Sequence, residues 1–120
     1  MAITKKKLEE IIKIIFEKKG DNLLLMDLKR RSPITDYFII CTAQSPLHAQ
    51  AISNEIESRL KKQNIRPHHI EGYTNGQWVI LDYWDCLIHI FLSEVRQFYG
   101  LERLWGDAPQ RRFVDQPTNQ

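Results

Sequence analysis

The side chains of this chain that are able to do chemistry are few, and they do not gather into a recognised motif. Cys41 lies inside an apolar run, where no electropositive helix terminus lowers the pKa of its thiol, so a nucleophilic role is disfavoured. His68 and His69 are adjacent in a predicted strand, so their side chains should face opposite ways and not grip one metal ion. The glycine-rich motifs GxGxxG and GxxxxGK, which cradle phosphates, do not occur. We therefore predict no catalytic residue, no metal site and no cofactor.

One arrangement of carboxylates leaves a metal-dependent reaction open as an alternative. Asp82 and Asp85 flank a predicted hairpin turn, while Asp27 and Asp36 stand near predicted strand ends. Four carboxylates brought together would suit a two-metal site, but aspartate is also a common turn residue exposed to solvent. His89 stands in an apolar strand, so it is either hydrogen-bonded inside the fold or presented on an open sheet face.

The elements that must position these side chains follow from the spacing of the apolar residues. Apolar residues from Leu8 to Phe16 recur with the helical period, which predicts an amphipathic helix over residues 4–19 capped by Thr4. Ser45 and Pro46 predict the start of a second helix that ends near residue 63. Strands are predicted over residues 22–28, 36–42, 68–71, 78–83 and 86–92, and a short last helix over residues 93–99.

These elements give the order αββαβββα. The economical arrangement is an α+β fold with a single mixed β-sheet of about five strands and helices on its faces. We assign residues 1–109 to one domain. Residues 110–120 show no periodicity and are predicted to form a flexible C-terminal tail.

The composition is that of one ordinary soluble domain. The chain has 120 residues, of which 42% are hydrophobic, with 17 basic and 15 acidic side chains. Its longest apolar runs have about five residues, far below the roughly 20 that span a bilayer, so we predict no membrane segment. Cys41 and Cys86 both lie in apolar runs, as expected of buried thiols in a reducing compartment. We therefore expect a cytoplasmic protein.

Charge and aromatic residues are unevenly distributed. Residues 67–109 carry six acidic but only two basic side chains, together with eight of the twelve aromatic residues. An acidic, aromatic-rich segment favours a recognition surface for a basic partner, although part of these aromatics must serve the core. The basic runs Lys5–Lys7 and Lys29–Arg31 justify at most an auxiliary contact with rRNA, and a general RNA-binding module is a weaker alternative.

Several sequence blocks closely resemble one known family. They are residues 36–40 (DYFII), 78–83 (WVILDY), 89–91 (HIF) and 98–108 (FYGLERLWGDA), together with Ser45, His48, Ala51, Ile52, Glu71 and Gly72. The block at 98–108 is long and compositionally unusual. Over roughly residues 5–109 the chain thus resembles the ribosomal silencing factor family, also called Iojap-like.

The resemblance implies a function without chemistry. Family members bind the large ribosomal subunit through universal large-subunit ribosomal protein fourteen, block joining of the small subunit and repress translation under nutrient limitation. It also implies homodimers and a nucleotidyltransferase-like fold. Nucleotidyltransferases hold a metal and triphosphate with a Gly-Ser loop and a DxD pair, whereas this chain has residues 42–45 (TAQS) at the loop and no DxD pair. We therefore expect a translation repressor and not an enzyme, with a nucleotidyltransferase-like metal-dependent enzyme as the alternative.

The resemblance places the partner-binding surface on the last two predicted strands and the segment after them. Its expected residues are Trp78, Asp82, Tyr83, Asp85 and His89 on the sheet, and Tyr99, Leu101 and Trp105 beyond it. Trp105 has a second interpretation, because it would equally dock the final segment back on the core. Family members commonly have glycine where this chain has Trp84, which leaves open whether the indole adds contact area or moves the hairpin edge.

Overall fold

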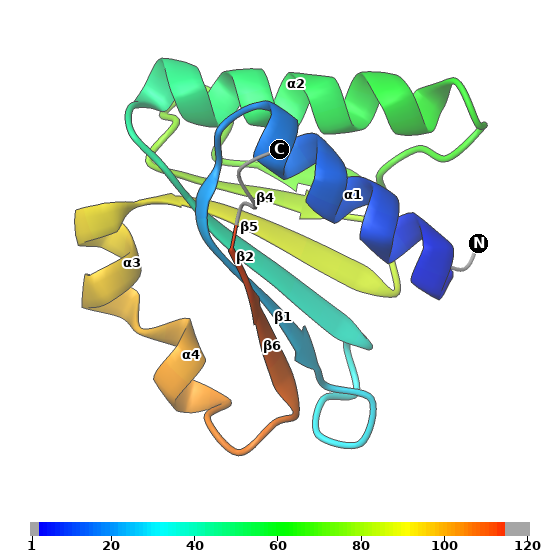
Figure 1. Ribbon diagram of the computed structural model, residues 1–120, viewed down its shortest axis with the longest axis vertical. Coiled ribbons are helices and arrows are strands. Elements are labelled where there is room, and N and C mark those ends of the chain that lie inside the picture. Colours follow the sequence, from blue (N-terminus) through cyan, green and yellow to red (C-terminus); the bar gives the residue numbers. More distant parts are fainter. Residues whose placement is uncertain (1–2, 115–120) are drawn as a thin grey trace.

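One mixed β-sheet with helices on both sides makes up the fold (Figure 1). The computed structural model describes residues 3–114. In chain order the elements are α1 (Lys5–Glu17), β1 (Asp21–Asp27), β2 (Tyr37–Ala43), α2 (Pro46–Lys61), β3 (His69–Glu71), β4 (Trp78–Asp82), β5 (Cys86–Leu92), α3 (Ser93–Tyr99), α4 (Leu101–Leu104) and β6 (Gln110–Phe113). The predicted α+β class and mixed sheet are confirmed.

The strands lie in the order β3-β4-β5-β2-β1-β6. β2 and β5 pair in parallel at the centre of the sheet, and the remaining neighbours are antiparallel. The parallel pair requires a crossover, which α2 provides on one side of the sheet. α1 and α2 lie on one side of the sheet, and α3 and α4 lie on the other (Figure 1).

The two long helices begin where their capping residues predict. The side-chain oxygen of Thr4 accepts a hydrogen bond from the backbone N–H of Lys7, and that of Ser45 accepts one from the backbone N–H of His48. Pro46 occupies the first turn of α2, where its missing N–H costs nothing. Local sequence therefore determines both helix starts.

Two separate cores lie on the two sides of the sheet. The core beside α1 and α2, here called the first core, is large and mainly aliphatic, and Ile11, Ile15 and Ile52 are fully buried in it. The core beside α3 and α4, here called the second core, has the buried members Leu24, Met26, Leu28, Ile40, Phe91 and Ala108. Cys41 and Cys86 are buried in the first core as predicted, and burial raises the pKa of the Cys41 thiol to about 12.

Two predictions about the C-terminal part are wrong. The sheet has six strands because Gln110–Phe113 form β6 along β1, where the sequence predicts a flexible tail. β6 is an edge strand whose first three residues are polar and exposed, so no apolar alternation marks it in the sequence. Leu101–Leu104 form the unpredicted helix α4. Residues 115–120, the rest of the predicted tail, lie outside the described residues.

No helix within residues 3–114 combines the length and the apolar character that crossing a membrane requires.

Candidate partner-binding surface

The sheet face on the side of α3 and α4 is covered only in part. Along β4, Trp78, Ile80 and Asp82 are half-buried, while the two residues between them are buried in the first core. Antiparallel pairing places a β5 residue opposite each of them. Three cross-strand pairs result: Trp78 with Phe91, Ile80 with His89, and Asp82 with Leu87. This stretch of sheet is apolar for most of its length, with one carboxylate at its end.

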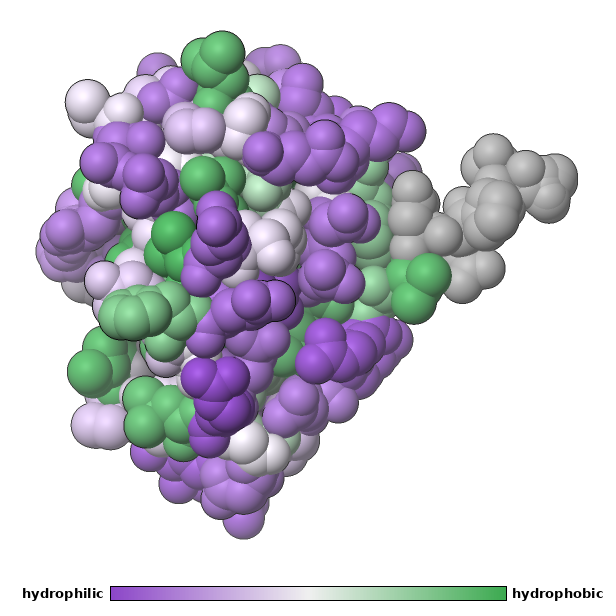
Figure 2. Space-filling view, turned by 90° about the vertical axis from the view of Figure 1, so that its left-hand side faces the viewer, coloured by the Kyte–Doolittle hydropathy of each residue, from purple (hydrophilic) through white to green (hydrophobic). Residues whose placement is uncertain are grey.

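Aromatic rings extend this face onto α3 and α4. Six of them are in contact and are here called the aromatic cluster: Phe38, Trp78, His89, Phe91, Tyr99 and Trp105. The Trp78 ring centroid lies 4.7 Å from that of Phe91 and 4.8 Å from that of Tyr99. Figure 2 faces the side that carries α3 and α4, where hydrophobic groups stand exposed among hydrophilic ones.

His89 is the buried polar member of the aromatic cluster. The indole Nε1–H of Trp78 donates a hydrogen bond to His89 Nδ1 at 3.1 Å. Burial lowers the pKa of His89 to about 3, so the ring is neutral near pH 7. A neutral imidazole that accepts at Nδ1 carries its proton on Nε2, which has no hydrogen-bond partner within residues 3–114. His89 thus holds the indole of Trp78 in place and brings no charge to the surface.

Arg96 of α3 fastens both short helices to the sheet. Its side chain is almost fully buried, and Nη1 donates to the backbone oxygen of Asn22 at 2.7 Å and to Thr42 Oγ1 at 2.8 Å. Nε and Nη2 donate to Glu102 Oε2 of α4 at 3.2 and 3.0 Å. Between the helices, Gly100 adopts a φ of 58°, a conformation that glycine reaches without strain. One guanidinium therefore sets where the aromatic side chains of α3 and α4 stand.

Comparison with known proteins agrees with the sequence blocks noted above. The chain matches the family model described as ribosomal silencing factor during starvation over residues 2–120. A protein from Halalkalibacterium halodurans named ribosomal silencing factor is 35% identical over 102 residues, which are 85% of this chain and 87% of that protein. The chain belongs to the ribosomal silencing factor family.

Two further relatives extend this result. A crystal structure of a Chromobacterium violaceum protein superposes with a TM-score of 0.83 at 26% identity and covers 96% of this chain and 95% of that one. A mouse protein named mitochondrial assembly of ribosomal large subunit protein 1 is 27% identical over 112 residues. That match covers 91% of this chain but 48% of the mouse protein.

Most residues predicted for the partner surface of a ribosomal silencing factor lie on one side of the sheet. They are Trp78, Asp82, His89, Tyr99, Leu101 and Trp105. Leu101 and Trp105 are half-buried and pack against the second core, so Trp105 docks the final segment and keeps part of its ring exposed. Tyr99 is 55% exposed and is the most accessible ring of the aromatic cluster.

Two predicted surface residues point to the other side. Tyr83 is only 1% exposed and lies in the first core, because an odd number of residues separates it from Trp78 along an alternating strand. Its prediction as a surface residue is wrong. Asp85 Oδ2 accepts the backbone N–H of Ile3 at 3.3 Å, and Ile3 belongs to the first core. Asp85 thus ties the start of the chain to the β4–β5 turn.

Four apolar residues of the surface were not predicted. Phe98 on α3 and Leu104 on α4 are 79% and 70% exposed. Ile80 and Leu87 are half-buried on the open sheet face. A signal for the helical pair exists, because the apolar residues between Val95 and Trp105 are too numerous for one face of a short helix.

The Trp84 question is answered by the backbone. Trp84 has a φ of 70°, the left-handed conformation in which glycine is usual, and the hairpin keeps its register. Its ring lies over His68, with centroids 4.0 Å apart, outside the aromatic cluster. The His68 and His69 rings are 5.2 Å apart and do not face opposite ways, because His68 precedes β3.

The aspartates of the metal alternative have separate structural roles. Asp27 Oδ1 accepts the backbone N–H of Lys29 at 3.0 Å, and Asp82 Oδ1 accepts that of Trp84 at 2.9 Å. Among residues 3–114 no three His, Cys, Asp or Glu side chains are grouped so as to hold a metal ion. The structure therefore offers no observation in favour of a metal-dependent enzyme.

Proposed function

We propose that this ribosomal silencing factor is a cytoplasmic translation repressor that acts by steric exclusion. It binds the large ribosomal subunit through universal large-subunit ribosomal protein fourteen, and its bulk then prevents the small subunit from joining, chiefly under nutrient limitation. The observation that carries the proposal is the half-open aromatic cluster, which is the largest group of contacting aromatic side chains on either side of the sheet within residues 3–114.

The chemistry of this surface suits a basic protein partner. Large aromatic side chains supply most of the free energy at protein interfaces. Glu71 of β3 lies on the same sheet face as Asp82, since β3 pairs with β4, and both add negative charge at the edge. Fixed acidic groups steer a cationic partner and make its association sensitive to salt.

A hollow beside Trp78 supports the same interpretation at the level of single side chains. It has a volume of about 440 Å³ and is lined by Trp78 and Tyr99 together with the carboxylate-bearing Glu94 and the exposed Phe98. Aromatic faces and a carboxylate together favour a lysine or arginine side chain. We expect such a residue of the ribosomal protein to anchor here.

Sedimentation with purified large subunits tests the proposal. Tyr99→Ala should reduce co-sedimentation at least tenfold, because truncating an interface anchor costs about 2–4 kcal/mol of binding free energy. Leu47→Ala is the matched control, since Leu47 is also exposed but lies on α2, on the other side of the sheet. Trp78→Ala should have an effect at least as large. Its fold is checked by circular dichroism, because Trp78 is half-buried.

A subunit-joining assay gives the functional readout. Wild-type protein added to separated subunits should reduce the yield of couples, and Tyr99→Ala should not. Equal loss of couples with Tyr99→Ala and wild type would contradict the proposed surface, and full coupling with both would contradict the repressor function itself.

A further inference from the structure

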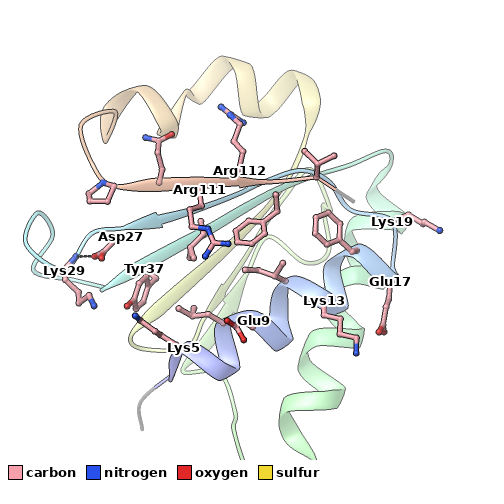
Figure 3. A pocket seen from close by; sticks show the side chains of 18 residues that line it. Lys5, Glu9, Lys13, Glu17, Lys19, Asp27, Lys29, Tyr37, Arg111 and Arg112 are labelled. Carbon is pink, nitrogen blue, oxygen red and sulfur yellow. Dashed lines mark hydrogen bonds between the residues drawn. The ribbon is translucent and has the colours of Figure 1, made fainter. Parts of the chain in front are cut away.

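The side of the sheet that carries α1 and α2 is incompletely covered. Strands are spaced about 4.8 Å apart and helices pack about 10 Å apart, so one helix covers about two strands. Six strands would need three helices on each side, whereas this side has two. The uncovered part is a groove of about 1470 Å³ between α1 and β6 (Figure 3).

The floor of the groove is apolar. It consists of Leu8, Ile12 and Phe16 from α1, Leu25 from β1, Tyr37 from β2 and Phe113 from β6. Several of these side chains are only partly buried and pack against the edge of the first core. A helix laid between α1 and β6 would bury them and complete the layer.

The rim of the groove is basic. Lys5, Lys13, Lys19, Lys29 and Arg111 line it, and Arg111 points into the groove whereas Arg112 points away from it (Figure 3). None of the four lysines forms an ion pair with another residue in the range 3–114.

The acidic residues of the groove do not balance this charge. Glu17 pairs with Arg59 of α2, outside the groove. Asp27 accepts the backbone N–H of Lys29, which leaves Glu9 as the acidic lining residue without such a contact within residues 3–114. The rim thus presents a surplus of positive charge above an apolar floor.

We propose that this groove binds an acidic amphipathic α-helix of a partner protein. The apolar face of that helix would lie on the floor, and its glutamates or aspartates would reach the lysines and Arg111 on the rim. α1 has 13 residues and is therefore about 20 Å long, so the groove accommodates a helix of about 13 residues.

The aromatic residues of the groove favour a helix over single-stranded RNA. Bases stack on free aromatic faces, but Lys29 Nζ lies over the Tyr37 ring at 5.0 Å and the Arg111 guanidinium lies over the Phe113 ring at 4.7 Å. The rest of the floor is largely aliphatic, which side chains of a helix match and phosphates do not. The groove and the aromatic cluster lie on opposite sides of the sheet, so the two proposals stand independently.

The probe is a fluorescein-labelled peptide of about 14 residues with leucines at helical spacing and glutamates flanking them. A scrambled peptide of the same composition has the same charge but no apolar face. Fluorescence anisotropy against the full chain should give at least tenfold tighter binding of the amphipathic peptide. Amide chemical shifts on titration should change on α1 and β6.

A charge-reversal pair locates the site. The double variant Lys13→Glu, Arg111→Glu should lose at least tenfold in affinity for the amphipathic peptide. The double variant Lys61→Glu, Lys62→Glu alters the same charge on exposed residues at the end of α2, outside the groove, and should stay within twofold of wild type. Both variants should still co-sediment with large subunits, which separates this result from the proposed function.

Other outcomes would overturn the proposal. Equal binding of the scrambled peptide would mean that charge alone acts. Displacement of the peptide by a tighter-binding single-stranded oligouridine would assign the groove to RNA. Binding seen only after truncation behind Val114 would make residues 115–120 the occupant.

Discussion

The two sides of the sheet use apolar residues for different purposes. On the side of α1 and α2, aliphatic residues such as Ile11 and Ile52 are fully buried in the first core. On the side of α3 and α4, rings such as Trp78 and Tyr99 remain partly exposed and are positioned by hydrogen bonds from His89 and Arg96. Apolar area that is already buried stabilises the fold and contributes nothing to association. Only area that the fold leaves open is available to a partner, which is why the second side is the candidate surface.

The largest expected effect is a loss of stability on the first side. Ile52→Ala deletes a fully buried side chain and should lower the free energy of unfolding by about 4 kcal/mol. Urea unfolding measures the change. Tyr99→Ala, in the comparison, should lower it by less than about 1 kcal/mol because Tyr99 is more than half exposed. A similar loss from both variants would contradict the division of roles.

The next effect separates attachment from stability on the second side. Arg96→Met removes the guanidinium that joins α3 to the sheet and to Glu102, and should cost about 3 kcal/mol. Hydrogen exchange should become faster in α3 and α4 while α2 stays protected. The control Arg103→Met removes an exposed arginine nearby and should change neither quantity. Uniform acceleration across both sides would mean that Arg96 stabilises the whole domain.

A pH effect of intermediate size should come from His89. Its pKa is about 3 in the folded protein and about 6.5 when unfolded, so between these values the unfolded chain binds a proton that the folded one does not. Stability therefore falls as pH falls through this window, by about 2 kcal/mol between pH 7 and pH 5. His89→Gln keeps an acceptor for the Trp78 indole and should remove this part of the slope. His68→Gln, at an exposed position, should retain it.

The smallest effect should come from the surface contact between α1 and α2. Arg59 pairs with Glu17 of α1 and with Glu55 of α2 at 2.8 Å, and all three side chains are partly exposed. These pairs raise the pKa of Arg59 and lower that of Glu55. Arg59→Ala should cost at most about 1 kcal/mol, since exposed ion pairs are solvated and screened. The difference from wild type should shrink in 1 M NaCl, and a difference that persists would point to packing of the arginine stem.

Much of the fold was predictable because its signals are local. The period of the apolar residues and the capping residues Thr4 and Ser45 predicted α1 and α2. The tight turn at Trp84 and Asp85 predicted the hairpin of β4 and β5. β6 escaped prediction because an edge strand with exposed arginines carries no periodic signal, and its pairing with Leu23–Met26 is a long-range contact.

The candidate site was predictable only in part. Resemblance to the family selected a segment that contains Trp78, His89 and Tyr99, and these three meet in the structure. It also selected Tyr83, which strand alternation turns into the first core. Family resemblance identifies a segment, whereas the side on which each residue emerges depends on register.

The amino-acid sequence by itself determined the helices, most of the strands and the family, because caps, apolar periods and a long motif are properties of neighbouring residues. Only the tertiary structure decided which aromatic residues are buried, that Trp78 donates to His89, and that a groove lies beside α1. The physical reason is that burial and hydrogen bonding join residues distant in the chain. Arg96, which spans to Asn22 and Thr42, shows this most directly.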